Sequence, residues 1–129
     1  EVMELDVQEG DSVKKGKLMA IVNPSIYEAI VTQANASVNQ FKANLASAKA
    51  NAIQAKAGFD QAKRNFDRKK QLHDDKVISD AEFEAPKLQL DPAYANNQTV
   101  MEHVNAAGFS VSSAEAQLKQ ANDNLKKTN

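Results

Sequence analysis

The sequence contains no cysteine and no tryptophan, and only four glycines and three prolines among its 129 residues. Without cysteine the chain has no disulfide framework, no thiolate metal site and no thiol catalysis. Aromatic residues make up 5%, and much of the 42% hydrophobic content is alanine, which fills a narrow seam rather than a broad globular core. The formal net charge of −1 gives no reason to expect nucleic acid as a partner. No apolar run reaches the roughly 18 residues that a membrane-spanning helix needs.

In place of a globular pattern, the sequence has a long heptad repeat on each side of Lys76. Before it, residues at alternating steps of four and three are apolar: Tyr27, Val31, Ala34, Val38, Phe41, Leu45, Ala48, Ala52, Ala55, Phe59, Ala62 and Phe66. After it, the rhythm returns in reverse: Leu90, Ala93, Asn97, Val100, Val104, Ala107, Val111, Ala114, Leu118, Ala121 and Leu125. This spacing is typical of a coiled-coil seam. The fold class is therefore mainly α, a long antiparallel two-helix coiled-coil hairpin with its tip near residues 72–79.

Folding the chain at Lys76 gives the seam a definite register. Large residues then face small ones, as interdigitating rows require: Phe59 lies against Ala93, Ala52 against Val100, Leu45 against Ala107, Val38 against Ala114, and Ala34 against Leu118. Asn97 falls opposite Ala55, where a polar seam residue can fix the register at some cost in stability.

Capping residues and prolines mark the ends of the two predicted helices. The first is expected from Pro24-Ser25, with Asn23 or Ser25 as its cap, to about His73. The second begins with a capping box, in which Ser79 is followed three residues later by Glu82. Pro86 and Pro92 each remove a backbone donor, so we expect a kink or short break between about Ala85 and Asp91.

Five lysines occupy one heptad position beside the seam: Lys42, Lys49, Lys56, Lys63 and Lys70. In one interpretation their stems cover the edge of the seam while the ammonium groups stay in water. In the other they form a basic stripe that meets a neighbouring copy or another protein. The positions that face them offer few acids, and the first interpretation is the simpler one.

Residues 2–22 have a different pattern, that of two short strands around a turn region. Apolar and acidic residues alternate from Met3 to Val7, and residues 18–22 form a continuous apolar run. Gly10 and Gly16 are turn signals, and Val13 between them is expected to point inward. Two short strands are marginal alone, so this segment needs partners. We divide the chain into a β segment, 1–23, and the hairpin, 24–129.

The string VQEGDSVKKGKLMAIV, residues 7–22, resembles the first half of a biotinyl/lipoyl-like domain through its EGD-x-V-x-x-G signature. In carrier domains of that class a Met-Lys pair follows at the hairpin turn, and its lysine holds the cofactor. Here the chain continues Asn23-Pro24-Ser25, without a lysine, so a swinging-arm role is disfavoured and no cofactor is expected. Because the chain opens inside an apparent strand, we expect it to be part of a longer protein.

A lipoyl half followed by a long α-hairpin resembles the periplasmic adaptor, or membrane fusion, proteins of bacterial efflux and type I secretion (HlyD-like, AcrA/MacA-type). In that family the hairpin is inserted between the two halves of the lipoyl domain, so the second half is expected after Asn129. The resemblance covers the EGDSVKKGKLMAIVNP stretch, the Ala/Lys-rich first arm and the VIS-x-x-E-F of the tip. Proline is unusual in the arms of the family, so Pro86 and Pro92 depart from its pattern.

The resemblance implies a function and a partner-binding site. The family's tip carries Arg-x-x-x-Leu and, seven residues later, Ser, which engage the outer-membrane channel; the pattern falls here on Arg68, Leu72 and Ser79. It implies a periplasmic subunit, anchored to the inner membrane in the full-length protein. Such a subunit links an inner-membrane transporter of the RND or ABC type to a TolC-like channel, and works as a ring of copies. Without the resemblance, these residues have structural explanations: Arg68 pairs with Asp67 or Asp75, Ser79 only caps its helix, and Leu72 closes the seam.

Other function classes have weaker support. His73, Asp74 and Asp75 could ligate a metal, but three adjacent residues in a turn are a poor constellation. The sequence has no catalytic triad pattern and no phosphate-binding glycine loop, and we predict that it is not an enzyme. Two alternatives remain, a hairpin chaperone or scaffold whose tip grips a client, and a carrier subunit of a biotin- or lipoate-dependent enzyme.

Overall fold

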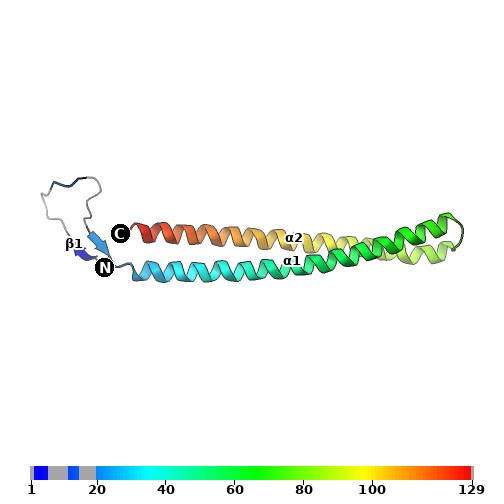
Figure 1. Ribbon diagram of the computed structural model, residues 1–129, viewed down its shortest axis with the longest axis horizontal. Helices are drawn as coiled ribbons and strands as arrows, with labels where there is room; N and C mark the ends of the chain where they lie inside the picture. Colours follow the sequence, from blue (N-terminus) through cyan, green and yellow to red (C-terminus); the bar gives the residue numbers. More distant parts are fainter. Residues whose placement is uncertain (1, 6–11, 15–19, 129) are drawn as a thin grey trace. The chain divides into compact units, whose positions relative to one another are not determined.

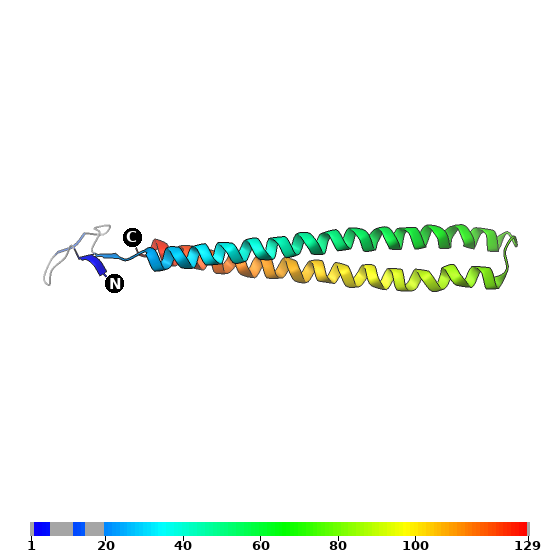
Figure 2. The same cartoon turned by 90° about the horizontal axis from the view of Figure 1, so that it is seen from below.

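The computed structural model describes residues 2–5, 12–14 and 20–128. Its elements in chain order are β1 (Val2–Leu5), β2 (Ala20–Val22), α1 (Ser25–Asp74) and α2 (Asp80–Lys126), which Figure 1 colours along the chain. The two helices run antiparallel and side by side in both Figure 1 and Figure 2. The predicted mainly α fold with a long two-helix hairpin is therefore confirmed.

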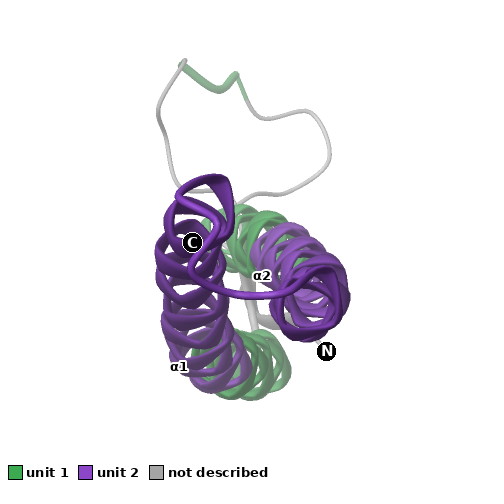
Figure 3. Ribbon diagram, turned by 90° about the vertical axis from the view of Figure 1, so that its right-hand side faces the viewer, with its two compact units in different colours: residues 1–42, 110–129 green, residues 43–109 purple. Residues whose placement is uncertain are grey.

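Two compact units divide the hairpin across both helices, and each is described by itself (Figure 3). The base unit holds residues 1–42 and 110–129, and the tip unit holds residues 43–109. The tip unit contains the turn between α1 and α2, and with it the candidate site.

In the base unit, β1 and β2 pair antiparallel, with Glu4 opposite Ile21, Leu5 opposite Ala20 and an irregularity after Val2. Most of the predicted EGD turn region lies outside the described residues, and the lipoyl-like identity of the segment stays a prediction. Val13, expected to point inward, is 45% exposed, so that prediction was wrong for the part of the turn that the structure describes.

The first helix begins where the sequence predicts. The Asn23 side-chain oxygen accepts hydrogen bonds from the backbone N–H of Ser25 at 3.0 Å and from its hydroxyl at 2.6 Å. The first helical hydrogen bond runs from the Glu28 N–H to the Pro24 carbonyl, 2.8 Å. Of the two proposed caps, Asn23 is therefore the residue whose side chain satisfies free backbone donors.

Burial in the base unit follows the predicted heptads. Val38 and Ala114, paired by the mirror, are each 3% exposed, and Val111 and Ala121 are also buried. Phe41 is the most open of the large seam residues here, at 36% exposed. Beside the seam, Lys42 Nζ lies 2.9 Å from a Glu115 carboxylate oxygen, an exposed ion pair between the two helices. Such pairs contribute at most about 1 kcal/mol, so the apolar seam carries most of the stability.

The tip unit continues the seam with more aromatic residues. The Phe59 ring contacts that of Tyr94, beside the predicted partner Ala93, with centroids 5.6 Å apart, and Phe66 contacts Phe83 at 5.4 Å. Ala52 is buried. The Asn97 side-chain oxygen is buried without a hydrogen-bond partner among the described residues, which is the destabilising polar seam position that the sequence predicts.

The sequence predicts a kink or short break in the second helix; the break was wrong, because α2 runs through both Pro86 and Pro92, and the kink stays a prediction. The carbonyls that lose their helical donor belong to Glu82 and Leu88, both exposed residues, so water can hydrogen-bond them. Pro86 itself is buried, at the seam position that the mirror sets against Phe66. Packing in the seam therefore compensates for part of the local cost of proline.

Candidate partner-binding tip

The end of α1 is closed by its own backbone. The Lys76 N–H donates to the His73 carbonyl and the Val77 N–H donates to the Leu72 carbonyl, both at 2.8 Å. This pair of bonds is the Schellman arrangement, in which one residue must adopt left-handed backbone angles. That residue is Lys76, with φ of 60°, although glycine is the usual choice because it has no Cβ. The turn therefore stores strain at the residue about which the sequence mirrors.

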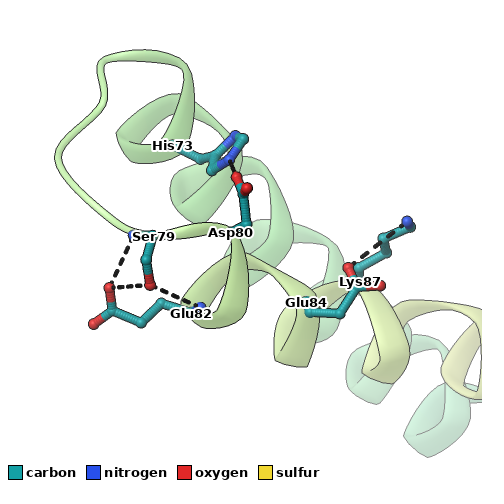
Figure 4. A network of polar contacts seen from close by, with 6 residues as sticks. All are labelled: His73, Ser79, Asp80, Glu82, Glu84 and Lys87. Atoms are coloured by element: carbon teal, nitrogen blue, oxygen red, sulfur yellow. Dashed lines mark hydrogen bonds and ion pairs between the residues drawn. The ribbon is translucent and has the colours of Figure 1, made fainter.

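The start of α2 is closed by side chains, as the capping box predicts (Figure 4). The Ser79 hydroxyl accepts from the Glu82 N–H at 3.3 Å, while the Glu82 carboxylate accepts from both the N–H and the hydroxyl of Ser79 at 3.0 Å. The backbone N–H of Ser79, followed by its hydroxyl, lowers the pKa of the Glu82 carboxyl below its ordinary value. The hydrogen bonds of the cap are therefore strongest while Glu82 is ionised.

A third set of contacts joins the two helix ends across the turn. His73 Nε2 lies 2.6 Å from Asp80 Oδ1, which Figure 4 shows reaching from the first turn of α2 toward the last turn of α1. The imidazole also stacks on the Phe83 ring, with centroids 4.8 Å apart and planes inclined by 17°. Phe83 touches Phe66 in turn, so the contacts of the tip lead directly into the seam.

The structure places the three predicted site residues in different surroundings. Arg68 is exposed on α1, and its Nη2 donates to the Asn65 side-chain oxygen at 3.0 Å rather than to Asp67 or Asp75. Leu72 lies one turn further along the same helix and is half-buried. Ser79 is exposed, but its hydroxyl already serves the cap in both directions. The Arg68 guanidinium therefore has most of its donors open to a partner, whereas the Ser79 hydroxyl has little capacity left.

Sequence reasoning missed the His73–Asp80 contact and the left-handed Lys76. His73 continues the sevenfold series of Phe59 and Phe66, so its heptad position was the signal that it would pack inward. For Lys76 the sequence offers no signal, because lysine is not a residue that favours positive φ. The hypothesis of a metal site at His73, Asp74 and Asp75 receives no support from the structure. Within the described residues, no group of three or more His, Cys, Asp or Glu side chains is placed to hold an ion.

Comparison with known proteins adds to this geometry. The family described as "RND MFP, alpha-helical hairpin domain" matches residues 44–128, which is more than half of the chain and includes the whole tip. The chain belongs to the RND membrane fusion protein family. No curated protein matches it.

Among solved structures, this membrane fusion protein chain is similar to MacA from Actinobacillus actinomycetemcomitans, with 30% sequence identity and a TM-score of 0.59. The match covers 91% of this chain but only 34% of MacA, so the chain spans about a third of that protein's length. A helix long and apolar enough to cross a membrane is not found among the described residues.

Proposed function

We propose that this chain is the hairpin part of a periplasmic adaptor that connects an inner-membrane transporter, of the RND or ABC type, to a TolC-like outer-membrane channel for export. Membership of the membrane fusion protein family supports this role, and the likeness to MacA over most of the chain supports it further. The adaptor acts mechanically rather than as an enzyme, and its copies assemble as a ring around the exported substrate.

The tip of the hairpin is the docking site for the channel in this proposal. The observation that carries it is the exposed Arg68, held on a helix whose end is fixed by the backbone turn and by the His73–Asp80 contact. A planar guanidinium on a rigid support can donate to the carboxylates or terminal carbonyls of a partner helix. Leu72 supplies an apolar contact one turn away, and Ser79 sets the start of the facing helix.

The β segment 1–23 is, in the same proposal, the first half of a lipoyl-like domain, to which the hairpin of residues 24–129 is joined. The antiparallel pairing of β1 and β2 supports this division. The carrier alternative lacks its lysine, because Asn23-Pro24-Ser25 leads directly into α1. In the full-length protein the adaptor is anchored to the inner membrane.

Charge reversal at the tip tests the docking role. Arg68→Asp in the full-length protein should abolish export of a pump substrate and its crosslinking to the channel, with helix content unchanged. The matched control is Lys119→Asp, which makes the same charge reversal at an exposed cation of α2 in the base unit. Full export by the Arg68 variant, or equal loss in both variants, would refute the assignment of the tip.

A further inference from the structure

Two edges flank the seam of the tip unit, and they differ in chemistry. The heptad positions on either side of a seam lie on opposite edges of a two-helix coiled coil. We call the lysine edge the set Lys49, Lys56, Lys63 and Lys70 from α1 with Tyr94 and Met101 from α2. We call the amide edge the set Asn44, Asn51, Gln54, Gly58, Gln61 and Asn65 from α1 with Gln89 and Asn96 from α2.

The lysine edge is open and carries apolar surface between its charges. Tyr94 is 50% exposed, with its hydroxyl accepting a hydrogen bond from the Gln98 side-chain nitrogen at 2.9 Å, and Met101 is 44% exposed. Lys56 pairs with Asp60 of its own helix at 3.2 Å, and Lys87, seven residues before Tyr94, pairs with Glu84 of its own helix at 3.8 Å. The cations therefore stand beside exposed Tyr94 and Met101 without acids across the seam to neutralise them.

The amide edge is hollowed. One hollow of about 490 Å³ is lined by Asn51, Gln54, Ala55, Gly58, Ala93, Asn96 and Val100. A second, of about 660 Å³, is lined by Gly58, Gln61, Ala62, Arg64, Asn65, Arg68 and Gln89. Both hollows border Gly58, and seam residues such as Ala55 and Ala62 form part of their walls. A side chain entering the first hollow would meet amide groups and apolar seam surface together, while the second hollow, toward the tip, also presents the guanidinium groups of Arg64 and Arg68.

Gly58 interrupts a sevenfold series of asparagines formed by Asn44, Asn51 and Asn65. A Cβ added to it would meet nothing within 4 Å, and its φ does not lie in the left-handed region, so no contact within the chain requires glycine. In a helix interior glycine costs about 1 kcal/mol relative to alanine. Gly108 is equally free of contacts, but of these two glycines only Gly58 lines the hollows, where the missing side chain leaves room for a group that enters from outside the chain.

Resting on the proposed ring of copies, we propose that the hairpins stand parallel to the ring axis and that the lysine edge of one copy packs into the amide edge of the next. Cyclic symmetry has no rise along its axis, so residues at equal height on the two edges meet. The ring contact between Tyr94 and Phe59 shows that Tyr94 stands at the height of Gly58. Tyr94 of one copy is therefore the group that enters the hollow at Gly58 of its neighbour.

Hydrogen-bonding capacity and charge select this pairing over the alternatives. Ammonium groups of the lysine edge donate, and the side-chain oxygens of Asn51, Gln54 and Gln61 on the facing edge accept. Two lysine edges facing each other would repel. A contact between unlike edges can also be repeated around a ring until it closes, whereas a contact between like edges ends at a dimer.

Cysteine crosslinking tests the contact, because the chain has no native cysteine. Full-length Gln61→Cys and Tyr94→Cys variants, co-expressed with different tags, should form a disulfide between the two variants, since a disulfide requires Cα atoms within about 7 Å. The control replaces Tyr94→Cys by Gly108→Cys, a position on the same edge two heptads away. The expected result is a crosslink with position 94 and none with position 108.

The outcomes separate this inference from the proposed function. A disulfide between two Tyr94→Cys copies, or equal yields at positions 94 and 108, would overturn the pairing of edges while export by the same cells still supports the adaptor. Gly58→Leu provides a second readout: with no clash inside the chain, it should keep its helix content and lose the 61–94 crosslink. Ala57→Leu, at an exposed position on the outer face, should keep it. Retention of the crosslink in the Gly58 variant would also refute the proposal.

Discussion

Ser79 is the residue where capping and docking can be separated by experiment. Its hydroxyl and N–H make three hydrogen bonds with Glu82 at the start of α2. Ser79→Ala removes the two bonds of the hydroxyl, and the loss of an N-cap side chain costs about 1 kcal/mol. Ser79→Asn keeps an acceptor for the Glu82 N–H but has no hydroxyl, so it should lose much less.

The effect should depend on pH with a definite sign. Because the pKa of Glu82 is lowered in the folded protein, its contribution is present in full above the ordinary carboxyl pKa of about 4.3 and is lost as the pH falls through the lower folded value. The destabilisation by Ser79→Ala should therefore be larger at pH 7 than at pH 3. A Glu82→Gln variant should show a weaker pH dependence than the native protein in the same range.

Two measurements follow the cap directly. Hydrogen exchange of the Glu82 and Phe83 amides reports opening of the first turn of α2, and thermal unfolding reports the whole hairpin. Ser113→Ala is the control, because Ser113 is an exposed residue inside α2 with no capping role. Unchanged exchange in Ser79→Ala, or equal changes at Ser79 and Ser113, would refute the capping argument. Normal export by Ser79→Asn would show that the cap alone accounts for Ser79, whereas lost export with a stable cap would assign the hydroxyl to docking.

Two further changes test the strained and the polar positions of the tip unit. Lys76→Gly should stabilise the protein by about 1 kcal/mol in chemical denaturation, because glycine adopts φ of 60° without strain; Lys70→Gly, inside α1, should destabilise it by a similar amount. Asn97→Leu removes a buried oxygen without a partner and should stabilise the hairpin by about 1–3 kcal/mol; a loss of stability instead would mean that Asn97 is satisfied. Asn97→Leu should also loosen the register of the seam. Disulfide crosslinking of cysteines at positions 45 and 107 should then report a mixture of registers.

Local rules explain why so much of the hairpin could be predicted. The period of the apolar residues fixes which face of each helix is buried, as the burial of Val38 and Ala114 shows, whereas the register derived from the mirrored rows stays a prediction. The capping box needs only Ser79 and Glu82, which lie within four consecutive residues at the start of α2, and it formed as predicted. Neither inference depends on how distant parts of the chain meet.

Contacts between the two helices, along the seam and across the turn, account for what the sequence alone did not predict. Pro86 and Pro92 have a large local penalty, but packing in the seam and access of water to the freed carbonyls keep α2 continuous. Lys76 adopts left-handed angles because the turn must close between two helices whose register is already set by the seam. His73 reaches Asp80 only because that turn brings the two helix ends together.

By itself, therefore, the sequence determined the helices and the faces that form their seam, because heptad spacing and capping act over a few residues at a time. The register and the partner-binding role of Arg68, Leu72 and Ser79 stay predictions. Only the tertiary structure decided that the prolines are absorbed, that Arg68 stays open while the Ser79 hydroxyl is used, and that Gly58 opens a hollow on one edge of the tip unit. These depend on the free energy of packing two helices against each other, which exceeds the local preferences of single residues.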